Sequence, residues 1–331
     1  MSKILVIGAT GVIGKVLVDA ILNAREQFDT IGIFTSEATI KNKKDLIDSF
    51  KSRGAVIRTG DVYNDDDVLN VFEGEWPLTR HYMALWHYYD TVVSAVGRFA
   101  IDKQVDLIAL AERSPTIQRF IPSEYGTDIA FDASSASEKP HQKKLKVRAY
   151  LESDAVQRLK YSYLVTGPFA DLFAGYMAAE PRVGNFDLEK KEAILAGDGH
   201  GPVGMTTVSD VGRALVAVLK HPEATENKAV LVHSFVATPD ELLKEYERQT
   251  GRPWTVSYTS MDELKKIEED AWAAEHPVAS IFTLRRIWAE GKTLYEKTDN
   301  EAIGLTKTDT LEMVIQANIA SPQAAFQSGK L

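Results

Sequence analysis

The chain has 331 residues, of which 44% are hydrophobic and 26% charged, and this composition excludes a disordered, collagen-like or coiled-coil protein. Its formal net charge of −9 argues against a nucleic-acid partner, because phosphate binding needs a basic surface. No apolar run approaches the roughly 18 residues of a membrane span, and the first residues lack the pattern of a signal peptide. We therefore expect a cytoplasmic protein with no membrane partner. The chain has no cysteine, and its seven histidines show no metal-ligand spacing, so we expect no disulfide and no metal.

Short β-rich runs alternate with helical stretches through the first half of the chain. The predicted strands are 3–7, 30–34, 55–58, 91–96, 119–121 and 161–165. The predicted helices are 11–23, 43–52, 65–72, 103–112 and 142–155. This alternation predicts an α/β fold of the Rossmann type, a doubly wound parallel sheet with helices on both faces.

The alternation breaks after Thr166, where glycine and proline mark loops between short elements. A helix over 208–219 and a strand over 229–233 are expected to return to the main sheet. Further helices are predicted over 240–249, 261–275, 278–290 and 308–316. We expect a dinucleotide-binding domain over 1–166, rejoined by 206–236. Residues 167–205 and 237–331 then form a smaller, helix-rich substrate-binding part.

A glycine-rich turn between the first strand and the first helix predicts a dinucleotide site. Its G-x-x-G-x-x-G spacing provides a tight turn, a close backbone approach to a pyrophosphate and close helix–strand packing. The N-terminus of the following helix offers free N–H groups to the phosphates. The predicted contacts are Gly8, Thr10, Gly11, Val12, Ile13 and Gly14.

The ends of the next strands bear on the choice of cofactor. Thr35 and Ser36 end the second strand where an acidic residue would hold the ribose of NADH, and Lys44 follows within a lysine run. These side chains favour the 2′-phosphate of NADPH, although Glu37 is an alternative acidic partner for a bare ribose. Asp61 is placed either to bind adenine or to close a surface turn. The small residues around Val96 and Gly97 leave room for the cofactor beside the first strand.

Lys144 is the candidate catalytic base. None of the twelve tyrosines has a lysine four residues later, so the tyrosine-based chemistry of many reductases is not expected. At helical spacing Lys144 shares an inward face with Val147, Arg148 and Leu151, whereas Lys143 and Lys146 point away. Burial there would lower the pKa of the amine. A lysine lying along the helix edge is the alternative.

Four segments together resemble the isoflavone reductase-like proteins, atypical short-chain dehydrogenases related to the NmrA regulators, phenylcoumaran benzylic ether reductase and pinoresinol–lariciresinol reductase. They are residues 8–14, 119–126, the Lys144-x-x-x-Arg148 pair and residues 194–199. The resemblance implies an NADPH pyrophosphate loop, a 2′-phosphate lysine at Lys44, a catalytic lysine at Lys144 and a cofactor-contacting arginine at Arg148. It also implies a mechanism in which the lysine removes a phenolic proton.

Two positions depart from the resembled pattern. Thr35 stands where relatives carry a phosphate-binding arginine, and the Gly167-Pro168-Phe169 segment replaces an Asn-Phe-Phe-like one. Phe169 therefore lies either against the nicotinamide or in the core. The predicted function is NADPH-dependent reduction of a small aromatic or polyketide-like secondary metabolite. The alternative is a non-catalytic NmrA-like sensor that binds the dinucleotide and reports redox state to a protein.

The aromatic segment 74–89 is longer than the connection from a helix to a strand requires. Such a connection lies at the edge of a parallel sheet opposite the cofactor, so a catalytic role is not expected. A homodimer interface, another partner site or an unspliced insertion are the interpretations left open.

Overall fold

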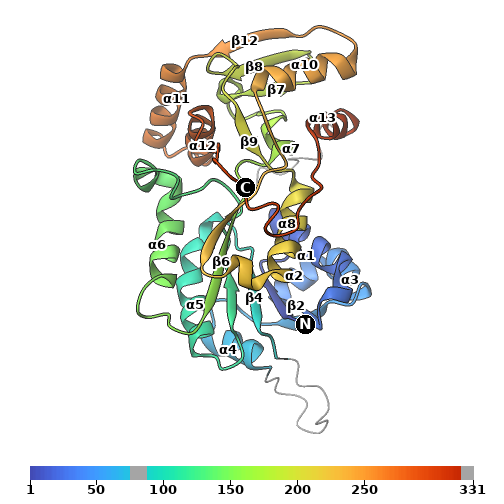
Figure 1. Cartoon of the computed structure of the whole chain (residues 1–331), viewed down its shortest axis with the longest axis vertical. Coiled ribbons are helices and arrows are strands. Elements are labelled where there is room, and N and C mark those ends of the chain that lie inside the picture. The colour runs from blue at the N-terminus through green and yellow to red at the C-terminus, as the bar shows by residue number, and fades with distance from the viewer. Residues whose placement is uncertain (75–87, 322–331) are drawn as a thin grey trace.

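A seven-stranded, wholly parallel sheet forms the centre of the molecule (Figure 1). The computed structural model describes residues 1–74 and 88–321. The strand order is β10-β6-β5-β4-β1-β2-β3. The bounds are β1 (Lys3–Ile7), β2 (Thr30–Thr35), β3 (Val56–Thr59), β4 (Thr91–Ser94), β5 (Arg119–Ile121), β6 (Lys160–Val165) and β10 (Lys228–Leu231). The predicted Rossmann-type sheet is confirmed, and β10 does rejoin it beside β6.

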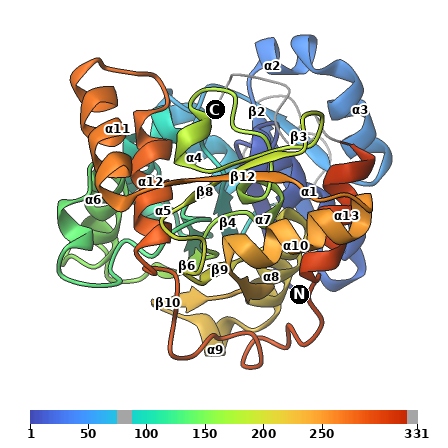
Figure 2. The same ribbon diagram turned by 90° about the horizontal axis from the view of Figure 1, so that it is seen from above.

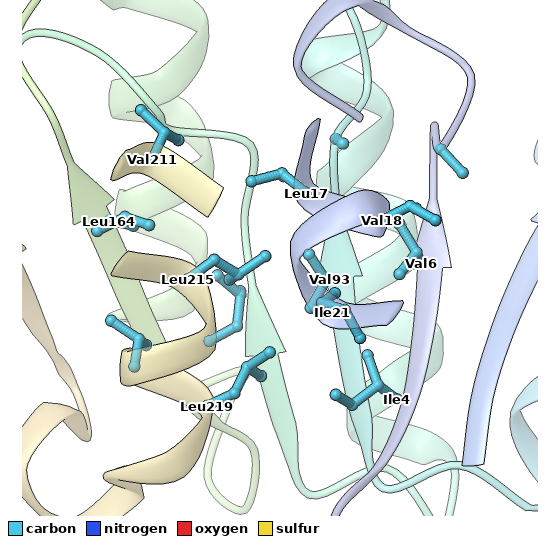
Figure 3. Packing of buried hydrophobic residues seen from close by; sticks show 14 of the residues in the cluster. Ile4, Val6, Leu17, Val18, Ile21, Val93, Leu164, Val211, Leu215 and Leu219 are labelled. Carbon is cyan, nitrogen blue, oxygen red and sulfur yellow. The ribbon is translucent and has the colours of Figure 1, made fainter. Parts of the chain in front are cut away.

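Helices cover both faces of this sheet, as expected for parallel strands that are apolar on both sides. One face carries α1 (Val12–Asn23), α3 (Lys44–Ser52) and α8 (Val208–Lys220), and the other carries α4 (Asp65–Glu73), α5 (Gln104–Arg113) and α6 (Gln142–Leu151). Figure 3 shows the first face, where α1 and α8 pack side by side on β1, β4 and β6. A methyl group built on Gly212 of α8 would lie 2.8 Å from the Cβ of Ala20 of α1, so the two helices approach closely only because this position is glycine.

The smaller part lies beyond the carboxyl ends of the strands, because β6 leads directly into α7 (Ala170–Phe173) (Figure 1). Two small sheets belong to it: β12-β8-β7 and β11-β9. Their bounds are β7 (Asn185–Asp187), β8 (Glu192–Ala196), β9 (Val203–Met205), β11 (Phe235–Ala237) and β12 (Thr255–Thr259). Seen from above in Figure 2, β8, β9 and β12 lie among α10 (Pro239–Thr250), α11 (Met261–Ala273), α12 (Ala279–Ala289) and α13 (Leu311–Ala320). The helices of this part were expected from the sequence, whereas its two small sheets were not predicted.

Several helices and strands begin or end at residues other than the predicted ones. The predicted helix 43–52 is preceded by a separate short helix, α2 (Glu37–Asn42), because the hydroxyl of Ser36 accepts the N–H of Thr39 and starts a helix there. The predicted helix 308–316 begins later, at Leu311, because Thr310 is its N-cap. The helix predicted to reach residue 155 ends at Leu151, and the fourth strand ends at Ser94. The remaining short helix is α9 (Pro222–Thr225), and the 3-10 turns are η1 (Arg25–Gln27), η2 (Arg98–Lys103), η3 (Ser135–Ser137), η4 (Lys139–His141) and η5 (Pro181–Val183).

The aromatic segment 74–89 falls for the most part outside the described residues, and with it the prediction of an interface there. Its last residue, Tyr89, is completely buried, and its hydroxyl accepts a hydrogen bond from Nε of Arg58 at 3.3 Å. The Nζ of Lys3 lies 3.6 Å from the ring centre of Tyr88. Within residues 1–74 and 88–321, no helix has the length and apolar character needed to cross a membrane.

Candidate functional site

The glycine turn has the geometry of a phosphate-binding loop. Gly8 has a φ of +85°, and a methyl group built on it would lie 2.4 Å from the carbonyl oxygen of Ala95. A methyl group on Gly14 would lie 2.1 Å from the carbonyl oxygen of Gly8. The N–H of Gly11 donates to that same oxygen at 3.0 Å and closes the turn. Glycine is therefore required at both ends of the motif, as the spacing predicts.

The N-terminus of α1 remains open toward this turn. Gly11 is its N-cap, so no side chain caps the first-turn N–H groups of Val12 and Ile13. Val12 is 46% exposed. Uncapped N–H groups and the positive end of the helix dipole suit a pyrophosphate. The turn thus brings together the six predicted residues Gly8, Thr10, Gly11, Val12, Ile13 and Gly14 at the carboxyl end of β1.

The carboxyl end of β4 forms the other side of this crevice. Here β1 and β4 are neighbours, and the strand order reverses, which is where ligands bind in open α/β sheets. The carbonyl of Val96 accepts the hydroxyl of Ser123 at 2.9 Å, which joins the loops after β4 and β5. A methyl group built on Gly97 would meet no atom within 4 Å. The space beside Gly97 is therefore open, as predicted for a residue that lies next to a cofactor.

Two neighbouring lysines point to different places. Lys43 lies between α2 and α3, and its Nζ donates to the carbonyl oxygen of Thr10 at 2.8 Å, so its ammonium lies at the glycine turn. Lys44 instead donates to Asp48 at 2.6 Å along the exposed side of α3. The geometry does not bring the predicted Lys44 to the turn. Its neighbour Lys43, counted in the sequence only as part of the lysine run, is the one whose ammonium lies at the turn.

The other predicted contacts to the adenosine half lie at the same edge of the sheet. Thr35 ends β2, and Ser36 uses its hydroxyl to cap α2. Asp61 follows β3 and accepts the N–H of Tyr63 at 2.9 Å, which is the geometry of a surface turn. Asp61 and Ser36 thus each have a local structural role, and a contact of either with adenine or ribose stays a prediction.

Lys144 lies on the inward side of α6, as the helix-face argument predicts. Val147, Arg148 and Leu151 are buried, whereas Lys143 and Lys146 are exposed. The half-buried Nζ of Lys144 donates to the backbone carbonyl of Glu124, in the loop after β5. Burial lowers the pKa of the Lys144 ammonium; Glu124 opposes this shift and Arg148 adds to it. A lowered pKa increases the fraction of neutral amine, the form that accepts a proton.

Arg148 has a different environment from the predicted contact with a cofactor. Its Nε and Nη2 donate to the two carboxylate oxygens of Glu124 at 3.1 and 3.0 Å, and its Nη1 lies 3.6 Å from Asp128. The guanidinium also lies 4.4 Å from the ring centre of Tyr163. All three nitrogens are thus used within the protein. The geometry favours Arg148 as a positioning residue for the loop that holds Lys144.

Phe169, Tyr125 and His200 lie in three different environments. Phe169 is half-buried and packs against the cluster that contains Tyr125. Tyr125 has a φ of 27°, and its buried hydroxyl has no hydrogen-bond partner in the described part of the chain. His200 is exposed and lies 2.7 Å from Asp240 on the surface. Residues 1–74 and 88–321 contain no group of three or more His, Asp or Glu side chains arranged to hold a metal.

Thr127 and Trp288 connect the two parts of the molecule close to Lys144. The indole Nε1 of Trp288, on α12, donates to the hydroxyl of Thr127 at 2.8 Å. A methyl group built on the adjacent Gly126 would lie 3.7 Å from Nζ of Lys144. Trp288 thereby connects α12 to the loop after β5. Its partner Thr127 lies 161 positions away in the chain, and no local pattern signals such a pair.

The open glycine turn, the crevice between β1 and β4 and the desolvated lysine together define a dinucleotide-binding α/β protein of the Rossmann type. A family model described as the NmrA-like family matches residues 1–313, and the chain belongs to this family. The predictions of the family and of the fold class are confirmed.

Curated relatives are reductases and oxidoreductases. The isoflavone reductase of Pisum sativum is 25% identical over 308 residues, which cover 89% of this chain and 90% of that protein. The oxidoreductase aprR of Aspergillus flavus is 30% identical over 266 residues, 80% of each chain. The prediction of an oxidoreductase similar to isoflavone reductase is confirmed at this level.

Solved structures share the fold over nearly the whole chain. AtPrR2 with NADP+ and (+)-pinoresinol has a TM-score of 0.78 at 22% identity, covering 96% of this chain and 98% of that one. The leucoanthocyanidin reductase–NADPH complex of Vitis vinifera has a TM-score of 0.77 at 20% identity, covering 96% and 99%. These neighbours bind the cofactor that the sequence predicts for this chain, NADPH or its oxidised form.

Proposed function

We propose that this protein is an NADPH-dependent reductase of a small aromatic or polyketide-like molecule, with Lys144 as the general base. The observation that carries the proposal is the position of Lys144. Its amine is half-buried, bonded to a backbone carbonyl of the loop after β5, and has a lowered pKa at the edge of the sheet where the glycine turn lies. A protein that only senses the dinucleotide has no need of such a base.

The residues that would hold the cofactor fit its chemistry. The turn at Gly8 and the uncapped start of α1 suit the pyrophosphate, and the open space at Gly97 suits a ring lying across the crevice. Lys43, fixed at Thr10, is the cation that we assign to the 2′-phosphate in place of Lys44. NADPH, when bound, supplies a hydride to an electron-poor carbon of the substrate.

Lys144 would manage the proton in this reaction. As a neutral amine it accepts the proton of a phenolic hydroxyl, and as an ammonium it returns a proton to the product. The buried pair of Arg148 and Glu124 fixes the loop whose carbonyl orients the amine. Arg148 also adds a positive charge that lowers the pKa of Lys144 and keeps more of it neutral.

The test is NADPH oxidation against a panel of phenolic, enone and quinone-methide-forming compounds, followed by substitution of the lysines. Loss of a general base typically lowers the rate by about 10²–10⁴-fold, so Lys144→Ala should lose most turnover while NADPH affinity stays within a few-fold. Lys143→Ala and Lys146→Ala, on the exposed side of the same helix, are matched controls and should be nearly silent. Near-normal turnover of Lys144→Ala would exclude it as the base, and dinucleotide binding without turnover of any compound would favour the sensor.

A further inference from the structure

A cavity of about 450 Å³ lies within the smaller part of the molecule. It has the size of a small-molecule site, for which about 300–1,000 Å³ is usual. Its lining residues run from Phe173 to Ala289 and include neither Lys144 nor any residue of the glycine turn. Most of the wall is apolar, with Phe173, Phe186, Leu195 and Met261 among its residues.

One buried charge lines this apolar cavity, the guanidinium of Arg285 on α12. Its side chain is 4% exposed, and it lies 4.7 Å from the ring centre of Phe173. Nη1 donates to the carbonyl of Phe173 at 3.0 Å, and Nη2 to that of Leu172 at 3.2 Å. Its Nε has no hydrogen-bond partner among the described residues.

No carboxylate of the described residues balances this charge. Within residues 1–74 and 88–321, Arg285 makes no ion pair, whereas the next residue, Arg286, pairs with Glu138, Glu268 and Glu290. Burial lowers the pKa of Arg285 to about 10, with no opposing contribution from an acidic neighbour. Asp198 also lines the cavity, but it is exposed and accepts the N–H of His200 at 3.0 Å.

A buried cation without a counter-charge costs several kcal/mol of desolvation, which two carbonyl hydrogen bonds offset only in part. A guanidinium has five N–H donors, and two are used by Leu172 and Phe173, so three remain, including the one on Nε. Neighbouring N–H groups of this planar fork match the two oxygens of a carboxylate. An anion in the cavity would therefore supply the charge and the acceptors that Arg285 lacks.

We propose that this cavity binds an apolar, ring-containing molecule that carries one carboxylate, with the carboxylate held by Arg285. The apolar walls bury the ring, and the arginine selects the acid over neutral analogues. The ligand is either the substrate of the proposed reductase or a separate effector. The binding itself does not depend on the proposed function.

The test is calorimetric titration of the full chain with 4-hydroxycinnamic acid and with its methyl ester, which differ only in the charged group. We expect the acid to bind at least tenfold more tightly than the ester. Arg285→Gln should reduce this preference to less than twofold, and Arg286→Gln, which removes the same charge one residue along α12, should keep it. Ala289→Leu reduces the cavity volume and keeps the charge of Arg285, so it should weaken acid and ester alike.

Equal affinity of the wild-type chain for acid and ester would overturn the proposal, as would failure of both to bind at millimolar concentration. Retention of the preference by a folded Arg285→Gln variant would also overturn it. If that variant does not fold, the wild-type comparison and Ala289→Leu still decide. With a neutral substrate in turnover, competitive inhibition by the acid identifies the substrate as the source, and non-competitive inhibition identifies an effector. Absence of any turnover would count against the proposed function and leave the binding result standing.

Discussion

Arg148 offers the sharpest test of how the candidate active site is built. In Arg148→Met the carboxylate of Glu124 loses both of its guanidinium hydrogen bonds, at 3.1 and 3.0 Å, and remains buried. The two side chains are only 8% and 2% exposed, so solvent does not replace the lost partner. Removing one member of such a pair costs about 3–5 kcal/mol, because an unpaired charge is left inside the protein.

The assay is urea unfolding of the two single variants and the double variant Arg148→Met/Glu124→Gln. The double variant removes the unpaired charge at Glu124, so its loss should fall short of the sum of the single losses by about 2 kcal/mol. Arg148→Lys keeps the charge and serves as the variant that folds if Arg148→Met does not. A loss of under about 1 kcal/mol for Arg148→Met would refute the assigned pairing.

The Arg148→Met variant also distinguishes a positioning role of Arg148 from a contact with the cofactor. Arg148 lowers the pKa of Lys144 and Glu124 raises it, so removing the arginine should raise that pKa. The acidic limb of the kcat/KM–pH profile, along which Lys144 loses its proton, should then move to higher pH. NADPH affinity should stay within a few-fold. An unmoved profile combined with a tenfold loss of NADPH affinity would show instead that Arg148 contacts the cofactor.

Three further predictions concern the cofactor site and the stability of the fold. Lys43→Ala should weaken NADPH binding about tenfold, the scale of one charge-assisted hydrogen bond, while NADH binding stays unchanged. Lys44→Ala should change the affinity for neither cofactor. If a fluorescence titration shows weaker NADPH binding for Lys44→Ala and not for Lys43→Ala, Lys44 binds the 2′-phosphate. Gly97→Ala should keep the wild-type Tm but bind NADPH more weakly, whereas Gly8→Ala should lower the Tm, because its φ of +85° and its close contacts leave no place for a methyl group. Burial lowers the pKa of His233 from 6.5 to about 4, so between these pH values the unfolded chain binds a proton that the folded chain does not. The free energy of unfolding should therefore fall by about 3 kcal/mol as the pH drops through this window. Urea titrations at pH 7 and 4.5 should show a smaller fall for His233→Gln than for the wild-type chain. An equal fall in both proteins would show that other groups cause it.

The central sheet was predictable because its strands are apolar on both faces and alternate with helices. Most strands of the smaller part carry no such signal. β7, β9 and β11 have three residues each, and β12 is exposed at four of its five positions. β12 pairs with β8 and β11 pairs with β9, which both lie much earlier in the chain, so neither strand is indicated by its own pattern.

Some features of the candidate site depend on residues close together in the sequence, and others depend on residues far apart. The glycine turn and the inward position of Lys144 follow from spacing within one segment, and both were predicted. The positions of Lys43 and Lys44 depend on a break between α2 and α3 at Lys43, which helical periodicity across 43–52 does not reveal. The partner of Arg148 is Glu124, in a loop 24 residues earlier, so the face could be predicted but the ion pair could not.

The position of α8 has a consequence for the order in which the protein is made. This helix covers β6 and packs on α1, through the contact of Gly212 with Ala20, yet it begins only at Val208 (Figure 3). A nascent chain that ends near residue 166 has the glycine turn and six strands but lacks both α8 and β10. Leu164 and the side of α1 that α8 covers would then face water, and the strand edge of β6 would lack its partner. The cofactor half therefore completes its fold only after residues 167–205, the first segment of the smaller part, have been synthesised.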